Sequence, residues 1–144
     1  MTEIIQNEVV VIGAGPGGYA AAFRAADLGQ RVVLIDKEES LGGVCLNRGC
    51  IPSKALLHLT KLIDDSKEAK KKGIVFDAPK INIEEIRSWK NAIISNLSSG
   101  ISRLAKARKV KTIIGTAKFQ SINKLEVKNA EPDTSISFEK AIIA

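Results

Sequence analysis

The hydrophobic pattern opens with two short β-branched runs on either side of a helical segment. Residues 8–12 (EVVVI) and 31–35 (RVVLI) are almost wholly apolar, which is typical of strands buried on both faces of a parallel sheet. Between them, residues 16–28 carry alanines at helical spacing and stop before Gly29, a residue suited to a left-handed helix end. This order predicts a right-handed βαβ unit, and we expect helices to cover both faces of its sheet.

Two more helices are predicted in the middle of the chain. After a polar loop over residues 36–43, apolar residues recur at helical spacing from Val44 to Ile63, and Pro52 is expected to kink or restart this helix. Another helix is expected over residues 83–107, where the apolar positions predict one buried stripe that makes Trp89 a core residue. The stripe consists of Ile86, Trp89, Ile93, Leu97, Ile101 and Leu104.

The last third of the chain changes to an apolar period of two. This period predicts short strands separated by polar turns, and therefore a small β meander. The expected strands cover residues 110–117, 118–122, 125–127 and 136–143, with turns at 122–124 and 129–134. Residues 141–144 (AIIA) are expected to form a buried strand, and the missing polar tail suggests a truncated chain. The predicted fold class is α/β, a Rossmann-like parallel sheet with helices plus a small β meander.

Composition limits the function classes. A chain of 144 residues with 44% hydrophobic content is expected to form about one globular domain. Its longest uncharged apolar stretch, residues 8–22, is too short and Gly-rich to cross a bilayer, so we expect a soluble, cytoplasmic protein without a membrane partner. The net charge of +6 comes largely from residues 67–72 and 106–111. Only 4% of residues are aromatic, so we expect these clusters to be solvated helix faces and not a nucleic-acid site.

A glycine motif follows the first expected strand and opens the first expected helix. Residues 13–18 (GAGPGG) match G-x-G-x-x-G in the context that makes this pattern informative. Gly13 permits a tight turn, Gly15 lets the backbone approach a pyrophosphate, and Gly18 lets the helix pack closely on the strand. The N-terminus of the helix then favours an anion without a lysine or arginine.

Asp36 stands at the end of the second expected strand, eighteen residues after Gly18. A carboxylate there can accept hydrogen bonds from ribose hydroxyls, which favours a dinucleotide and disfavours the 2′-phosphate of NADP. The motif alone does not choose between FAD and NAD. The structural alternative is that the glycines only shape a turn and Asp36 only caps a strand.

The two cysteines, Cys45 and Cys50, form a C-x4-C pair. Their spacing puts them on neighbouring helix faces, within disulfide reach if Gly49 and Pro52 loosen the turn. So short a loop would stabilise folding by only about 2 kcal/mol, so a redox role is favoured over a structural one in a reducing cytosol. A closed zinc site needs four ligands, and the only histidine, His58, is expected to be a packed or surface helical residue; we expect no metal. Two ordinary buried thiols remain the alternative.

Two segments carry a resemblance to a known family. Residues 42–58 (GGVCLNRGCIPSKALLH), taken with residues 9–29, are similar to the class I flavoprotein disulfide reductases, and the similarity runs over essentially the whole chain. Leu46 and residues 52–57 look most like the members that oxidise dihydrolipoamide. Glutathione reductase and mercuric reductase share the outline.

The resemblance implies FAD as the first nucleotide and assigns its contacts. Asp36 replaces the usual glutamate, one methylene longer, and Arg48 replaces the usual valine, where a cation could lower a nearby thiol pKa. The implied contacts are Gly13, Gly15, Pro16 and Gly18 at the pyrophosphate, Asp36 at the adenosine ribose, Lys37 as a further cofactor-binding residue, Gly42, Gly43, Val44 and Cys45 along the flavin, Lys54 at the isoalloxazine edge, and the backbone at Gly115 to Ala117 near adenine.

The resemblance also implies a reaction. Dihydrolipoamide attacks Cys45 and releases Cys50, which passes electrons through FAD to NAD+. Residues 1–144 would be the N-terminal part of a FAD domain, without the NAD-binding and interface domains, and inactive alone. The full protein would be a homodimer that serves lipoyl domains of 2-oxo acid dehydrogenase complexes. A related reductase for another disulfide or a metal ion, and a non-catalytic nucleotide-binding module, are the alternatives.

Overall fold

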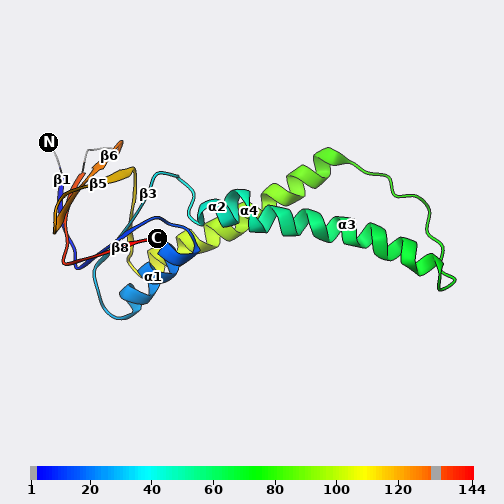
Figure 1. Ribbon diagram of the computed structural model, residues 1–144, viewed down its shortest axis with the longest axis horizontal. Helices are drawn as coiled ribbons and strands as arrows, with labels where there is room; N and C mark the ends of the chain where they lie inside the picture. Colours follow the sequence, from blue (N-terminus) through cyan, green and yellow to red (C-terminus); the bar gives the residue numbers. More distant parts are fainter. Residues whose placement is uncertain (1–2, 131–133) are drawn as a thin grey trace.

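The computed structural model describes residues 3–130 and 134–144. Two sheets lie together, and a pair of long helices projects away from them (Figure 1). The elements run in the order β1 (Glu3–Gln6), β2 (Val9–Ile12), α1 (Pro16–Asp27), β3 (Val32–Asp36), α2 (Gly43–Arg48), α3 (Cys50–Lys70), α4 (Ile83–Ala107), β4 (Lys111–Ile114), β5 (Thr116–Ser121), β6 (Lys124–Lys128), β7 (Thr134–Ser137) and β8 (Lys140–Ile143).

The first sheet is parallel and has the strand order β4-β3-β2-β8. Its centre is the predicted βαβ unit, β2–α1–β3, in which Val10 pairs with Val33. Gly29 follows α1 with a φ of 82°, the left-handed conformation expected there. The Rossmann-like parallel sheet with helices is therefore confirmed.

The two faces of this sheet are covered by different kinds of structure. Val9 and Val11 point into a core cluster with Ala22 of α1 and Ala105 of α4. The side chain of Val10 points to the opposite face of the sheet, into a second cluster that the two sheets share. The expectation of helices on both faces is therefore wrong. The fully buried Leu125, Val127 and Ile136 of β6 and β7 supply the apolar cover on the second face.

The second sheet has the strand order β1-β7-β6-β5. Its antiparallel part, β5–β6–β7, is the predicted meander, with the first hairpin turning at Ile122 and Asn123. β1 was not predicted and pairs with β7 in parallel. β4 and β8 join the parallel sheet and not the meander, which corrects their expected placement. Residues 131–133 of the second expected turn lie outside the described residues.

The expected strand over residues 136–143 divides in two at Phe138 and Glu139. Its second half, β8, lies at the edge of the parallel sheet beside β2. Ile143 is 74% exposed, so the expectation of a buried C-terminal strand is wrong. An edge strand has one uncovered side, which its sequence does not reveal.

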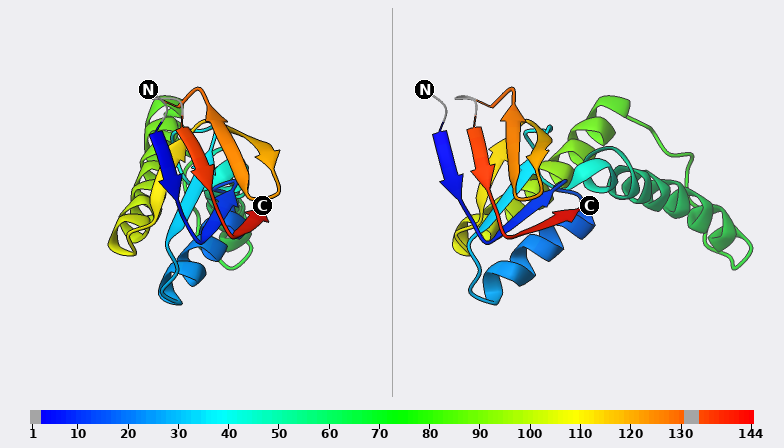
Figure 2. Two further views of the ribbon diagram at one scale, coloured as in Figure 1. Left: turned by 90° about the vertical axis from the view of Figure 1, so that its left-hand side faces the viewer. Right: turned by 60° about the vertical axis from the view of Figure 1, so that its left-hand side comes forward.

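The long helical segment expected from Val44 breaks at Gly49 and not at Pro52. Pro52 is accommodated in the first turn of α3, where the backbone N–H groups have no intrahelical partner. α3 and α4 contact each other and then diverge as they project from the sheets (Figure 2). Only the C-terminal part of α4 packs on the core, through Ile101 and Ala105.

The apolar stripe on α4 is consequently only half covered. Trp89 is 39% exposed and Leu97 43% exposed, so Trp89 is not a core residue as expected. Near the far end of α3, Lys67 pairs with Asp64 and Lys71 with Glu68, which confirms a solvated charged face for that cluster. None of the helices in the described part of the chain is long and apolar enough to cross a membrane.

Candidate functional site

The glycine loop joins β2 to α1 at the carboxyl edge of the parallel sheet. Gly13 has a φ of 99° and donates its N–H to the Ile35 carbonyl at 2.8 Å. A Cβ on Gly18 would overlap the Gly13 carbonyl oxygen. Both glycines are thus required by the turn and by the contact between helix and strand, as the sequence predicted.

Gly15 has a different environment. It caps the N-terminus of α1 with extended backbone angles, and a Cβ there would meet nothing within 4 Å. No side chain caps this helix, its first turn has no acidic residue, and Pro16 is exposed. The first N–H groups of α1 therefore face open space beside a position without a side chain, which fits the binding of an anionic phosphate.

Asp36 ends β3 and organises the loops on both of its sides. Its Oδ2 accepts a hydrogen bond from the Ala14 N–H at 2.6 Å, and its Oδ1 accepts one from the Glu38 N–H at 2.9 Å. Each carboxylate oxygen keeps a lone pair for a further donor, so the same group can accept a ribose hydroxyl. Lys37 is exposed on the adjoining loop.

Replacing Asp36 with asparagine is expected to weaken both this brace and nucleotide binding. The amide has one acceptor atom, so either Ala14 or Glu38 loses its hydrogen-bond acceptor, and we expect a loss of about 1–2 kcal/mol in unfolding free energy. Urea unfolding measures this loss. FAD titration is expected to show about tenfold weaker binding, and unchanged affinity would contradict the assignment of the ribose to Asp36.

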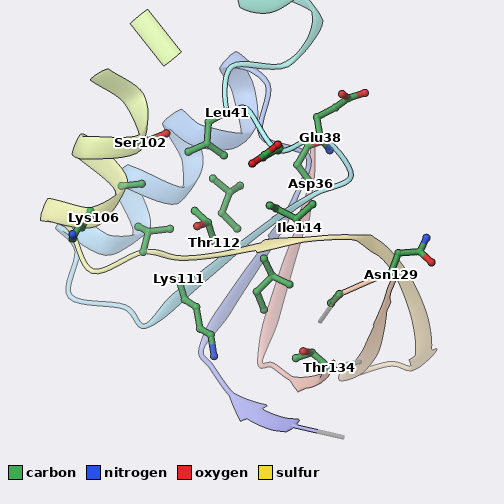
Figure 3. Close-up of a pocket in the computed structure, with 16 residues that line it drawn as sticks. Asp36, Glu38, Leu41, Ser102, Lys106, Lys111, Thr112, Ile114, Asn129 and Thr134 are labelled. Carbon is green, nitrogen blue, oxygen red and sulfur yellow. The ribbon is translucent and has the colours of Figure 1, made fainter. Parts of the chain in front are cut away.

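A cleft of about 750 Å³ opens beside Asp36, between the end of β3, α4 and β4. Figure 3 shows Asp36 and Glu38 at one side, Ser102 and Lys106 of α4 at another, and Asn129 across from them. Sequence analysis found Asp36 but missed the residues on α4. Ser102 and Lys106 are four residues apart on one helix face, and Lys106 with Lys111 brings part of the second basic cluster to this cleft.

Gly115 and Ala117 lie beside this cleft without lining it. Gly115 donates its N–H to the Asp36 carbonyl at 2.8 Å, and Ala117 packs on the core cluster under the second sheet. The side chain of the neighbouring Ile114 lines the cleft instead. A backbone contact from Gly115 to adenine stays a prediction.

A second loop connects this region to the cysteines. Gly42 and Gly43 have φ values of 114° and 61°, and Gly42 donates its N–H to the Ala14 carbonyl at 2.9 Å. A Cβ on Gly43 would lie 2.7 Å from Cα of Gly15. α2 therefore starts directly against the glycine loop, and Val44, 64% exposed, is the next residue.

The structure brings the two cysteines together. Cys45 lies in α2, Cys50 is the first residue of α3, and both are thiols in hydrogen-bonding contact. That hydrogen bond raises the pKa of the Cys45 thiol above its ordinary value, and partial burial and the neighbouring Cys50 charge raise it further. The Cys50 backbone N–H and the Lys54 ammonium lower the pKa of Cys45 and only partly offset this.

The sequence suggested Arg48 as the cation that lowers a thiol pKa, but the cation that acts on Cys45 is Lys54. Arg48 donates instead to Glu38, with Nη2 3.1 Å from Oε1. His58 is exposed on α3, as expected for a surface helical residue. In the residues described, no group of three or more side chains is arranged to hold a metal ion.

Replacing Lys54 with glutamine is expected to raise the pKa of Cys45 further. Because this pKa already lies above its ordinary value, Cys45 is mostly protonated at pH 8 and alkylates slowly, and the variant should be slower still. We expect a roughly two- to threefold lower rate at low salt, since Lys54 is exposed and screened. Iodoacetamide labelling followed by peptide mass mapping measures it. An equal effect at 1 M salt would exclude a charge mechanism.

The fold and the site together define a dinucleotide-binding domain with a dithiol centre next to its glycine loop. Residues 7–144 match the pyridine nucleotide-disulphide oxidoreductase family, and the chain belongs to this family.

Curated relatives share one printed name, dihydrolipoyl dehydrogenase. The chain is 51% identical to the protein of Buchnera aphidicola subsp. Schizaphis graminum and 49% identical to that of Vibrio cholerae, each over 144 residues and 100% of the chain. It is 41% identical to the Staphylococcus aureus protein over 97% of the chain. In each case it spans 30% of the relative's length.

Proposed function

We propose that this chain is the FAD-binding, dithiol-bearing segment of an enzyme that oxidises dihydrolipoamide with NAD+ as electron acceptor. One observation carries the proposal: α2, which holds Cys45, begins against Gly15 at the open N-terminus of α1. A nucleotide bound on that loop would extend past the cysteine pair. The similarity to relatives named dihydrolipoyl dehydrogenase supports the choice of substrate.

The described residues fit FAD. The pyrophosphate would lie on Gly15 and the first turn of α1, and the adenosine would lie in the cleft beside Asp36. Val44 and Lys54 would face the flavin half, where the ammonium favours negative charge. When bound, FAD would supply the two-electron redox chemistry that connects the dithiol with NAD+.

The cysteines perform the exchange with substrate. A dihydrolipoamide thiolate attacks the Cys45 sulfur of the oxidised pair, the Cys45–Cys50 bond breaks, and Cys50 leaves as a thiolate at the N-terminus of α3. The second substrate thiol, once deprotonated, attacks the mixed disulfide and releases Cys45. Lipoamide leaves as a disulfide, and the raised pKa of Cys45 favours its return to the protonated thiol.

Other parts of the assignment concern the longer protein. We propose that the NAD+ site and the substrate's acid–base group lie outside the matched segment, since the relatives are more than three times as long. A homodimer, a cytoplasmic location, and lipoyl domains of 2-oxo acid dehydrogenase complexes as partners are proposed with the substrate. The similarity at Leu46 and residues 52–57 supports the lipoamide branch over glutathione or metal-ion reduction.

A visible spectrum tests the function. FAD added to the protein is expected to bind, and two-electron reduction should give a long-wavelength thiolate–flavin band that Cys50→Ser eliminates. Assays of the full-length protein against dihydrolipoamide and glutathione then decide the substrate. Failure to bind FAD would overturn the assignment of FAD as the cofactor. If the spectrum after two-electron reduction were the same in Cys50→Ser, the cysteines would have no redox role and the chain would be a nucleotide-binding module only.

A further inference from the structure

Arg48 joins the turn between the cysteines to the loop that carries the ribose carboxylate. It is the last residue of α2, and its Nη2 donates to Glu38 Oε1 at 3.1 Å. The same glutamate donates its backbone N–H to Asp36 Oδ1, and Asp36 Oδ2 accepts the Ala14 N–H. A continuous series of polar contacts therefore runs from the glycine loop to the residue before Gly49.

A second contact ties the same two segments. Asn47 donates its side-chain amide to the Ser40 carbonyl at 3.3 Å, so successive residues at the end of α2 are attached to the loop after β3. Gly49, which follows, has no side chain with which to anchor the turn. A Cβ there would lie 3.1 Å from the Val44 carbonyl oxygen. The position of Cys50 relative to α2 thus depends on side chains that precede it.

Glu38 also faces the nucleotide cleft. Its side chain lines the cleft together with Asp36 (Figure 3), so a ribose bound at Asp36 would order the loop that presents Glu38 to Arg48. The Arg48–Glu38 pair is seen with Cys45 and Cys50 both as thiols. Arg48 and Gly49 lie between the two cysteines, so forming the disulfide constrains the turn that contains them.

We propose that Arg48, acting through Glu38, is a positioning residue that couples nucleotide binding in the cleft to the redox equilibrium of the cysteine pair. This inference rests on the proposed nucleotide site. A bound nucleotide would order the loop that carries Glu38, and the Arg48–Glu38 ion pair would then hold the turn between the cysteines. The dithiol arrangement, in which this ion pair is seen, is therefore favoured. Because the Arg48 and Glu38 side chains are 60% and 41% exposed, the coupling is expected to be about two- to fivefold and to weaken with salt.

ADP is the probe that isolates this coupling, because it has the ribose and pyrophosphate but no flavin to touch the cysteines. The dithiol–disulfide equilibrium is measured by thiol titration in dithiothreitol buffers, with and without ADP. Calorimetry gives ADP affinity for the reduced and the oxidised protein, and linkage requires the two ratios to agree. In the unsubstituted protein ADP is expected to shift the equilibrium about two- to fivefold toward the dithiol.

Variants locate the coupling. Arg48→Gln, Glu38→Gln and the double variant should each reduce the ADP effect to near unity, with no further loss in the double variant, and Arg48→Lys should restore part of it. The matched control is Lys61→Gln, which breaks a 2.7 Å ion pair with Asp65 on α3 and should leave the effect unchanged.

The outcomes separate this coupling from the function on which it rests. ADP binding without any shift of the redox equilibrium, or an equal shift in Arg48→Gln, overturns the coupling and leaves the nucleotide site standing. An equal loss in Lys61→Gln overturns it too, because the effect would then not depend on the loop. If calorimetry detects no ADP binding at millimolar concentration, the nucleotide site fails and the coupling fails with it.

Discussion

Under the proposed function, replacing Cys50 with serine is expected to abolish dihydrolipoamide oxidation by the flavin-loaded, full-length protein. Serine cannot form or break the bond with the Cys45 sulfur, so the exchange with substrate has no disulfide to attack and no thiolate to release. Because the two cysteines act as one unit, Cys45→Ser and the double variant should each lose as much activity as Cys50→Ser, at least about a thousandfold. NADH formation at saturating substrate measures the loss.

Thiol titration of the 144-residue chain gives an independent readout of the same prediction. After mild oxidation the unsubstituted chain should lose both of its titratable thiols within a monomer, whereas Cys50→Ser retains one. Thr60→Ala on the exposed side of α3 is the control, since it removes a methyl group and a hydroxyl that donates to the Leu57 carbonyl, and neither group belongs to the cysteine site. Appreciable turnover by either cysteine variant would show that electrons reach the nucleotide by another route.

The features that the sequence predicted best are the local ones. The β2–α1–β3 unit, the glycine loop and the cysteine pair each lie within a short stretch, where residue spacing and backbone preference decide the structure. The close contact of Gly18 with Gly13 could be predicted because both ends of the contact belong to one motif. Asp36 followed from the same motif, although its hydrogen bond to Ala14 did not.

The features that could not be predicted depend on partners far along the chain. The apolar pattern of a strand does not indicate which sheet the strand joins. The sequence therefore predicted that β4 and β8 belong to the meander, whereas they extend the parallel sheet on either side of β2 and β3. Trp89 lies on an amphipathic helix as predicted, but the buried fraction of that helix depends on where α4 leaves the sheets. Lys106 reaches the cleft only because α4 ends beside β4, and its sequence context indicated a solvated face.

Gly15→Ala is expected to leave the fold intact and to weaken FAD binding by about a hundredfold or more. The backbone at Gly15 has φ −68° and ψ −178°, which alanine adopts without strain, and its Cβ would enter open space. The melting temperature of the nucleotide-free protein should therefore change by no more than about 2 °C. The methyl group would instead stand where a pyrophosphate must approach the backbone.

Gly18→Ala should show the reverse balance, because its Cβ would overlap the Gly13 carbonyl oxygen within the protein itself. The helix must move away from β2, and we expect the unfolding free energy to fall by about 3 kcal/mol or more. Gly17→Ala is the matched control, since its Cβ would be exposed and 3.9 Å from the Ala144 methyl, the one neighbouring atom within 4 Å. This substitution should keep FAD affinity and gain a few tenths of a kcal/mol from helix propensity.

Urea unfolding of the nucleotide-free proteins and FAD titration by flavin fluorescence separate the two kinds of glycine. A variant that loses binding without losing stability identifies a position whose missing side chain serves the ligand, whereas Gly18 serves the fold. If Gly15→Ala bound FAD as tightly as the unsubstituted protein, the pyrophosphate would not lie against this turn. The cysteine pair, which α2 holds against the same turn through Gly43, would then lack an adjacent nucleotide to receive its electrons.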